Sequence, residues 1–178
     1  MKKRVCLFCG SQYGNSEIIL EQVNLLCEEL VTKGYELVYG GGKNGLMGFV
    51  ADIFLKHNRE VIGVRPKKLI TEEGIHEKLN KLIVVEDMFE RKKKMIGLAD
   101  TFITLPGGVG TIDELFDVFT QKKIGFNNKV CAVFNPDGFY NELDSQLETM
   151  VKFGFLKAED KTRLIIESDI DTLLNRIG

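Results

Sequence analysis

The glycine-rich stretch LPGGVGTIDELF, residues 105–116, has residue types suited to binding an anion and to acid–base chemistry. Its glycines let the backbone of residues 107–111 come close to a ligand, and the N–H groups that open the following helix can bind a phosphate. Glu114, or the adjacent Asp113, would then project toward a bound sugar, where a carboxylate stabilises developing positive charge or orients water. The structural alternative is a capping box, in which Thr111 caps the helix and Glu114 bonds back to its N–H.

The segment DMFERKKKMIGLAD, residues 87–100, directs two cations to an apolar helix face. At about 100° per residue, Arg91 and Lys92 fall within an apolar stripe, while Lys93 and Lys94 fall on the other side. The stripe is made by Met88, Met95, Ile96, Leu98 and Ala99. Burying a cation without an anionic partner is costly, so we expect Arg91 and Lys92 to face a ligand. The alternative is an ordinary solvated face.

Short apolar runs alternate with helical patterns along the chain, which predicts the elements that must position these groups. Near-continuous Val, Ile and Leu runs are typical of strands buried on both faces. We therefore expect an α/β fold, a Rossmann-like, doubly wound, mainly parallel sheet of about seven strands with helices on both faces, as one domain over residues 1–178. Strands are expected at residues 4–10, 36–40, 59–64, 81–86, 101–106, 129–135 and 163–168. Helices are expected at residues 15–33, 45–57, 88–99, 111–123, 138–151 and 169–176.

Three of the loops that follow strands are rich in small residues, and ligands of such sheets bind beyond the carboxyl ends of the strands. These loops are CGSQYGNS, YGGGKNGLMG and LPGGVGT, and together they favour a phosphorylated ligand. Gly40, Gly42 and Gly45 also satisfy the G-x-G-x-x-G pattern of dinucleotide-binding proteins. The next strand ends at Arg65 rather than at an acid, so the alternative is an NADP-dependent oxidoreductase with Arg65 at the 2′-phosphate.

Charge and cysteine content narrow the classes further. The 24 basic and 26 acidic residues give a formal net charge of −2, which offers no large positive field for a nucleic acid. Apolar runs are too short for a membrane span, and we expect a cytoplasmic protein with no membrane partner. With only two histidines, no metal site is expected. Reduced core thiols are expected at Cys6, Cys9, Cys27 and Cys131, with the first two on opposite faces of a strand.

An ordered set of motifs resembles those of the Lonely Guy (LOG) family, the cytokinin riboside 5′-monophosphate phosphoribohydrolases. PGGVGTIDE is similar to the family's P-G-G-x-G-T-x-x-E, and MFERKKKM to its M-x-x-R-K segment. YGGGKNGLMG resembles its Y-G-G-G-x-x-G-L-M-G, and CGSQYGN its opening loop. The resemblance runs from residue 4 to residue 156. Relatives were long labelled lysine decarboxylases, yet no lysine here has a setting typical of a pyridoxal phosphate Schiff base.

The resemblance implies hydrolysis of the N-glycosidic bond of an adenosine 5′-monophosphate carrying an N6 substituent, giving free base and ribose 5-phosphate without a cofactor. It implies that Arg91 and Glu114 are the catalytic pair, and that the protein is a homodimer. The implied nucleotide site comprises Glu73, Arg91, Lys92, Gly108, Val109, Gly110, Thr111, Ile112, Asp113, Glu114 and Thr120. For Glu73, the alternative is a solvated acid in the sequence TEEG.

The implied reaction agrees with the residues, because cleaving a nucleoside builds oxocarbenium character that a carboxylate near the sugar stabilises. Arg91 would hold Glu114 ionised or bind phosphate or sugar. A non-catalytic nucleotide carrier or sensor is a further alternative. Plant-like relatives read T-W-A-Q-L-G-I-H-x-K-P where this chain has TQKKIGFNNKV, so Gln121, Lys123 and Val130 leave the base preference and the assembly open.

Overall fold

The computed structural model describes residues 3–178 and contains a seven-stranded sheet in the order β4-β3-β2-β1-β5-β6-β7. Every neighbouring pair of strands is parallel, so the expected doubly wound α/β fold is confirmed. Residues 1 and 2 of the expected single domain lie outside the described residues. The strands are β1 Arg4–Phe8, β2 Glu36–Tyr39, β3 Val61–Pro66, β4 Lys81–Val85, β5 Thr101–Thr104, β6 Val130–Phe134 and β7 Leu164–Glu167.

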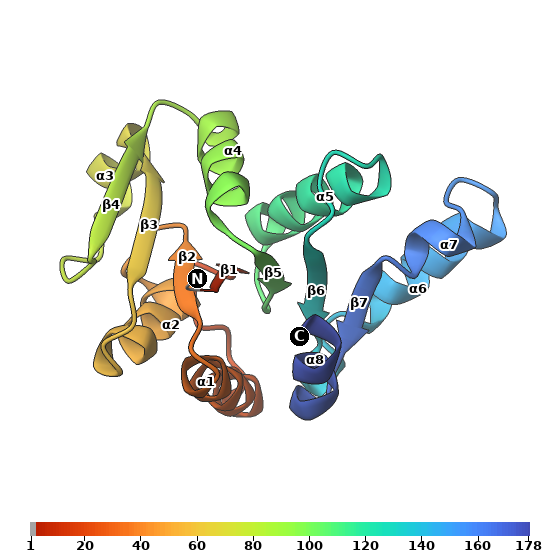
Figure 1. The fold of residues 1–178 in the computed structure, drawn as a ribbon, viewed down its shortest axis with the longest axis horizontal. Coiled ribbons are helices and arrows are strands. Elements are labelled where there is room, and N and C mark those ends of the chain that lie inside the picture. The colour runs from red at the N-terminus through yellow and green to blue at the C-terminus, as the bar shows by residue number, and fades with distance from the viewer. Residues whose placement is uncertain (1–2) are drawn as a thin grey trace.

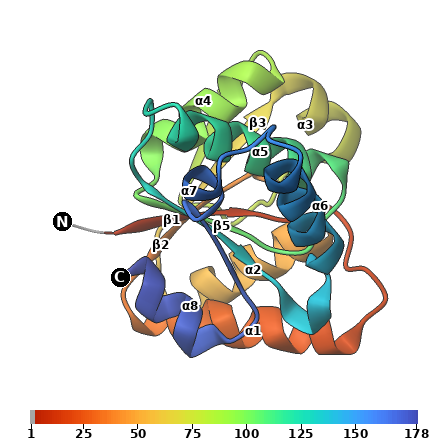
Figure 2. The same cartoon turned by 90° about the vertical axis from the view of Figure 1, so that its right-hand side faces the viewer.

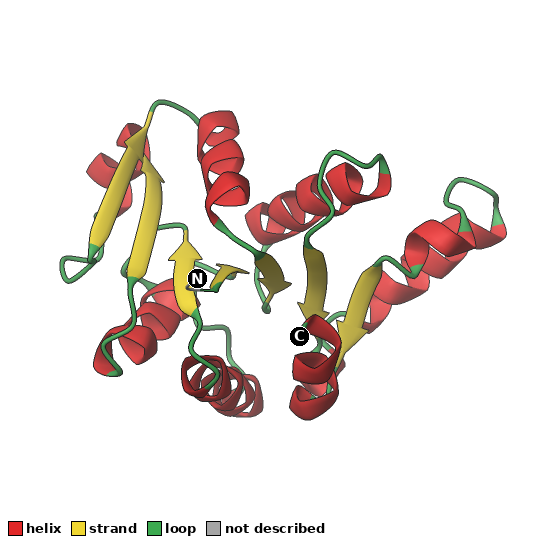
Figure 3. Ribbon diagram, in the orientation of Figure 1, coloured by secondary structure: helices red, strands yellow, loops and turns green. Residues whose placement is uncertain are grey.

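Helices cover both faces of the sheet, as Figures 1 and 3 show from one side and Figure 2 from another. Helices α1, α2 and α8 pack on one face, and α4, α5 and α6 on the other. The helices are α1 Glu17–Thr32, α2 Gly45–Lys56, α3 Lys67–Glu73, α4 Met88–Leu98, α5 Val109–Lys123, α6 Asn141–Lys152, α7 Ala158–Lys161 and α8 Ile170–Ile177, with a 3-10 turn η1 at Pro136–Gly138. Within residues 3–178, none of them is long and apolar enough to cross a membrane.

Two apolar layers, one on each side of the sheet, explain why the strand sequences are apolar without alternation. Along β1, Val5 and Leu7 pack in the layer under α1 and α2, whereas Cys6 and Phe8 pack under α4 and α5. Cys9 continues the first series, so it and Cys6 lie on opposite faces, as predicted. All four cysteines are buried with free thiols.

Helices α3 and α7 and the turn η1 were not predicted, because they lack the apolar periodicity of a packed helix. Helix α3 has no buried residue at all. Helix α5 begins at Val109, two residues before the expected start at Thr111, with Gly108 in extended conformation as its N-cap. The early start changes the environment of the acids that follow.

The strand order reverses beside β1, because β2, β3 and β4 lie to one side and β5, β6 and β7 to the other. The loops after β1, β2 and β5 meet at this point. The Gly10 N–H donates to the Pro106 carbonyl at 3.1 Å, and the Met47 N–H donates to the Gly10 carbonyl at 3.2 Å. The three small-residue loops therefore lie at one edge of the sheet, where ligands of open α/β sheets bind.

Candidate active site

A cavity of about 290 Å³ lies beyond the carboxyl ends of β1 and β5. Its walls come from the loop after β1 (residues 9–11), the start of α5 (residues 108–111) and the short helix α3. Four charged side chains line it, namely Arg65, Glu73, Arg91 and Glu114. Segments that are far apart in the sequence thus supply two cations and two carboxylates to one small space.

Arg91 and Glu114 form a buried ion pair, with 3.2 Å between Nη2 and Oε1. Arg91 lies on α4, whose N-cap Asp87 accepts from the Glu90 N–H at 2.8 Å. Lys93 and Lys94 are exposed on the same helix, as predicted, whereas Lys92 does not line the cavity with Arg91. The helix therefore presents Arg91 to the cavity and leaves Lys93 and Lys94 in solvent.

Burial raises the pKa of the Glu114 carboxyl above its ordinary value of 4.5, and the guanidinium of Arg91 counteracts part of that shift. Within residues 3–178, two atoms of the pair are buried without a hydrogen-bond partner, the Nε of Arg91 and the Oε1 of Glu114. Buried polar groups are normally hydrogen-bonded, so a charged pair with hydrogen-bonding capacity to spare is consistent with a binding function for the cavity.

The capping-box alternative for Glu114 is wrong. Gly108, not Thr111, is the N-cap of α5, and the Thr111 N–H instead donates to the Gly108 carbonyl at 3.1 Å. The glycines allow the helix to begin two residues early, which places Glu114 beyond the first turn. Its carboxylate contacts Arg91 across the cavity.

The loop between β5 and α5 packs closely against the loop after β1. A Cβ on Gly107 would lie 2.2 Å from the Thr111 Oγ1 and 2.8 Å from the Gly10 nitrogen, so a larger residue does not fit there. This contact brings the opening turn of the fifteen-residue helix α5 to the cavity wall. The free N–H groups of that turn and the helix dipole favour an anion.

Four of the predicted site residues lie outside the cavity. Lys92 pairs with Asp113, with 3.0 Å between Nζ and Oδ2, and the two residues join α4 to α5 beside the cavity. Ile112 is half-buried in the layer on that face of the sheet. Thr120 is exposed near the end of α5, nine residues beyond Thr111 and roughly 13 Å along the helix axis. The structure does not bring Thr120 together with the others.

Glu73 lines the cavity and is not simply the solvated acid of the alternative interpretation. Its Oε2 lies 2.7 Å from the Nη2 of Arg65. The guanidinium of Arg65 also donates to the Gly40 carbonyl at 3.2 Å. Arg65 was predicted only as a contact for a 2′-phosphate, whereas here it binds a carboxylate and a carbonyl. A cation at the end of an apolar strand was the signal that marked it.

Cys9 and Met47 also line the cavity and were not predicted as site residues. Burial raises the pKa of the Cys9 thiol well above its ordinary value, and the nearby Glu114 carboxylate adds to the shift. The thiol is therefore neutral. No sequence pattern distinguishes these residues from ordinary core residues.

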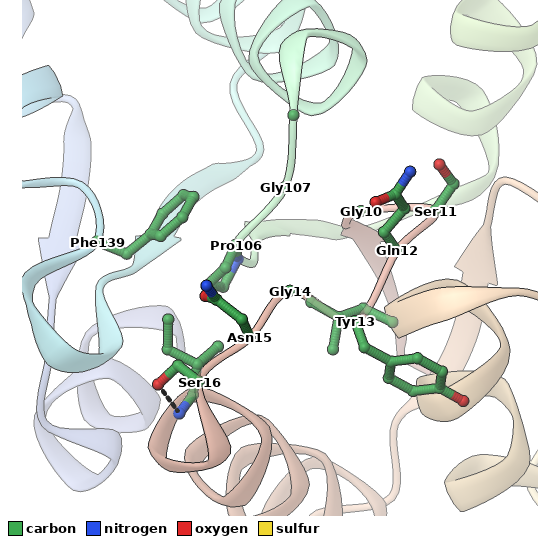
Figure 4. Close-up of a pocket in the computed structure, with 13 residues that line it drawn as sticks. Gly10, Ser11, Gln12, Tyr13, Gly14, Asn15, Ser16, Pro106, Gly107 and Phe139 are labelled. Carbon is green, nitrogen blue, oxygen red and sulfur yellow. Dashed lines mark hydrogen bonds between the residues drawn. The ribbon is translucent and has the colours of Figure 1, made fainter.

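A second hollow, of about 400 Å³, adjoins the cavity and shares Gly10, Ser11 and Gly108 with it. Its surface is mostly apolar, although Ser11, Gln12, Asn15 and Ser16 also line it. In the view of Figure 4, Pro106 and Asn15 lie between Phe139 and Tyr13. The shared residues make the glycine loops a partition between a charged cavity and a more apolar hollow.

The variant Gly40→Ala tests how tightly the Arg91 guanidinium is held. A Cβ on Gly40 would lie 2.0 Å from the Nη2 of Arg91, so the guanidinium must move away from Glu114. We expect the free energy of unfolding to fall by about 1–3 kcal/mol, as in overpacked cores, measured by urea denaturation. Gly97→Ala, on the helix α4 that carries Arg91, is the control, because its Cβ enters open space. A Gly40→Ala protein as stable as wild type would contradict the expectation.

The fold and the cavity define a Rossmann-like α/β protein with a paired-charge site at the point where the strand order reverses. The family model described as "Possible lysine decarboxylase" matches residues 47–177. The chain is 39% identical to the probable cytokinin riboside 5′-monophosphate phosphoribohydrolase LOGL3 of Oryza sativa subsp. japonica, over 98% of this chain and 83% of that protein. It is 41% identical to the cytokinin riboside 5′-monophosphate phosphoribohydrolase LOG1 of Arabidopsis thaliana, over 86% of this chain and 72% of that protein. The chain belongs to this LOG family.

Solved structures of low sequence identity share the fold. The molybdenum cofactor binding protein from Rippkaea orientalis has a TM-score of 0.73 at 19% identity, covering 99% of this chain and 96% of its own. The Moco carrier protein from Chlamydomonas reinhardtii has a TM-score of 0.72 at 16% identity, with the same coverage. At such identities the likeness concerns the fold alone.

Proposed function

We propose that the protein hydrolyses the N-glycosidic bond of an adenosine 5′-monophosphate with an N6 substituent, releasing the free base and ribose 5-phosphate. The observation that carries the proposal is the buried Arg91–Glu114 ion pair, whose two residues line a cavity bounded by glycine loops. Membership of the LOG family supports the same reaction, since relatives over nearly the full chain are named for it.

The 5′-phosphate is proposed to bind at the opening turn of α5, at residues 108–111, which line the cavity. The backbone N–H groups of this turn and the positive end of the helix dipole can bind the phosphate directly, without a contribution from any side chain. Binding the phosphate fixes the ribose relative to Glu114, so that binding energy is used to position the reacting carbon.

Glu114 is proposed to act at the sugar. As the bond from the anomeric carbon to the base nitrogen breaks, its electron pair leaves with the base, and positive charge develops on the ribose. The Glu114 carboxylate stabilises this charge and orients water, whose oxygen bonds to the anomeric carbon while a proton goes to the base. Arg91 favours the ionised form of Glu114, because its guanidinium counteracts part of the rise that burial causes in the pKa of the carboxyl.

The rest of the implied site is also part of the proposal. Glu73 and Thr111 line the cavity and would contact the nucleotide there. Lys92 and Asp113 would support it by holding α4 against α5, and Ile112 and Thr120 are included because they match the family motif. We further propose that the chain forms one domain, assembles as a homodimer and acts in the cytoplasm, with water as its only co-reactant.

A turnover assay tests the proposal directly. Purified protein incubated with AMP, or with isopentenyladenosine 5′-monophosphate, is expected to release free base and ribose 5-phosphate, measured by liquid chromatography. The matching nucleoside without phosphate serves as control and should have a lower kcat/KM. Tight binding of both nucleotides without products would favour the carrier or sensor instead, and a rise in Tm caused by a dinucleotide alone would favour the oxidoreductase.

A further inference from the structure

Arg65 is a buried cation that the proposed mechanism does not use. It is the penultimate residue of β3, is 1% exposed, and lines the cavity next to the glycine loop after β2. One guanidinium nitrogen donates to the Gly40 carbonyl at 3.2 Å, and the other lies 2.7 Å from the Glu73 carboxylate. Its Nε has no hydrogen-bond partner among residues 3–178. A fully buried guanidinium is costly, so its contacts have to offset that cost.

Glu73 depends on this contact for its position. It is the last residue of α3, a seven-residue helix with no buried residue. A helix this short is marginal by itself, because helices in proteins are held mainly by packing of an apolar face. The Glu73 side chain is 45% exposed. Its 2.7 Å contact with the rigidly buried Arg65 therefore fixes it far better than α3 does.

The cavity thus contains two arginine–carboxylate pairs that share one support. Gly40 accepts from Arg65 through its carbonyl, and its missing Cβ leaves the space that the Nη2 of Arg91 occupies. Arg91 pairs with the buried Glu114 at 3.2 Å, and Arg65 pairs with the more exposed Glu73 at 2.7 Å. In each pair a buried guanidinium, that of Arg91 from α4 or that of Arg65 from β3, contacts a carboxylate of a residue that lines the cavity.

We propose that Arg65 is a positioning residue, which aims the Glu73 carboxylate so that it accepts hydrogen bonds from the ribose hydroxyls of the bound nucleotide. This rests on the proposed function. An ionised carboxylate is purely an acceptor, so hydroxyl donors suit it, while the 5′-phosphate would be repelled. The phosphate therefore binds at the α5 end of the cavity and the hydroxyls at the α3 end.

A double-mutant cycle of Arg65→Met and Glu73→Gln tests this positioning role. Each single variant is expected to raise the KM for AMP, and its Kd measured by calorimetry, about tenfold, with a smaller change in kcat. Because Arg65 acts through Glu73, the double variant is expected to bind no more weakly than Glu73→Gln alone. The proposal would be overturned if the increase in Kd of the double variant equalled the product of the two single increases, or if Arg65→Met left the Kd unchanged.

Controls separate positioning from loss of the fold. Arg65→Lys keeps the charge and should recover part of the affinity that Arg65→Met loses. If the two variants have the same Tm, a purely structural role of Arg65 would not produce this recovery. Lys68→Met removes an exposed cation from α3, the helix that carries Glu73. The Lys68 Nζ lies 3.8 Å from the Glu72 carboxylate, and this variant should leave the Kd unchanged. Since the cycle is read from Kd, it tests Arg65 even if turnover is absent, which would count against the proposed function alone.

Discussion

Replacing Glu114 by Gln is expected to lower kcat by about 10²–10³-fold, the usual effect of removing one preorganised electrostatic group from a transition state. The substitution keeps the shape of the side chain and removes only its charge. Nucleotide binding should change little, because the phosphate is proposed to bind at residues 108–111. Single-turnover kinetics and calorimetry with AMP measure the two effects separately.

The matched control for Glu114→Gln is Glu142→Gln, an exposed acid in the first turn of α6 on another part of the surface. It should retain wild-type kcat. If Glu114→Gln kept kcat within a few fold of wild type but melted at a lower temperature, Glu114 would be a structural residue and the proposed chemistry would fail.

Replacing Arg91 by Met is expected to shift the pH dependence of the reaction as well as to lower kcat. Burial raises the pKa of Glu114 and Arg91 counteracts the shift, so without Arg91 the pKa rises further. Activity that needs the carboxylate is lost as pH falls through this pKa. The acid limb of the kcat profile should therefore move to higher pH in Arg91→Met, measured between pH 4 and pH 9 with AMP as substrate.

The same substitution should change stability with pH in a defined direction. A carboxyl whose pKa is higher in the folded than in the unfolded state binds its proton more tightly when folded. The free energy of unfolding therefore falls as pH rises from the pKa of the unfolded state through the pKa of the folded state. The fall should be larger in Arg91→Met, since breaking a buried pair costs about 3–5 kcal/mol. Urea unfolding at pH 4 and pH 7 measures it, with the exposed Lys94→Met as control. Equal losses at both pH values would contradict an ionised Glu114.

The strands and the face of α4 could be predicted because their signals are local. A strand covered on both sides is apolar throughout, and a cation on an apolar helix stripe marks Arg91 as buried. Helix α3 could not be predicted, because a helix without a buried residue leaves no periodic pattern. The start of α5 was misplaced because capping-box spacing competes with the ability of Gly108 to act as N-cap.

The pairing of charges within the cavity is a tertiary property and has no signal in a single segment. Arg65 and Glu73 are eight residues apart, but only the turn from β3 into α3 decides that they meet. The family motif predicts Thr120 as a site residue, whereas in the structure Thr120 is exposed near the end of α5. Motif spacing thus predicts which residues matter better than it predicts what each one touches.

The pairing of β1 with β5 has a consequence for co-translational folding. The Arg4 N–H donates to the Asp100 carboxylate across 96 residues, and Val5 is in register with Thr101. A nascent chain that has emerged only as far as β4 holds Arg65 and Glu73 but has neither β5 nor the helix α5 that carries Glu114. Ligand affinity is therefore a property of the completed fold, and nucleotide present during synthesis would stabilise the finished protein without rescuing its intermediates.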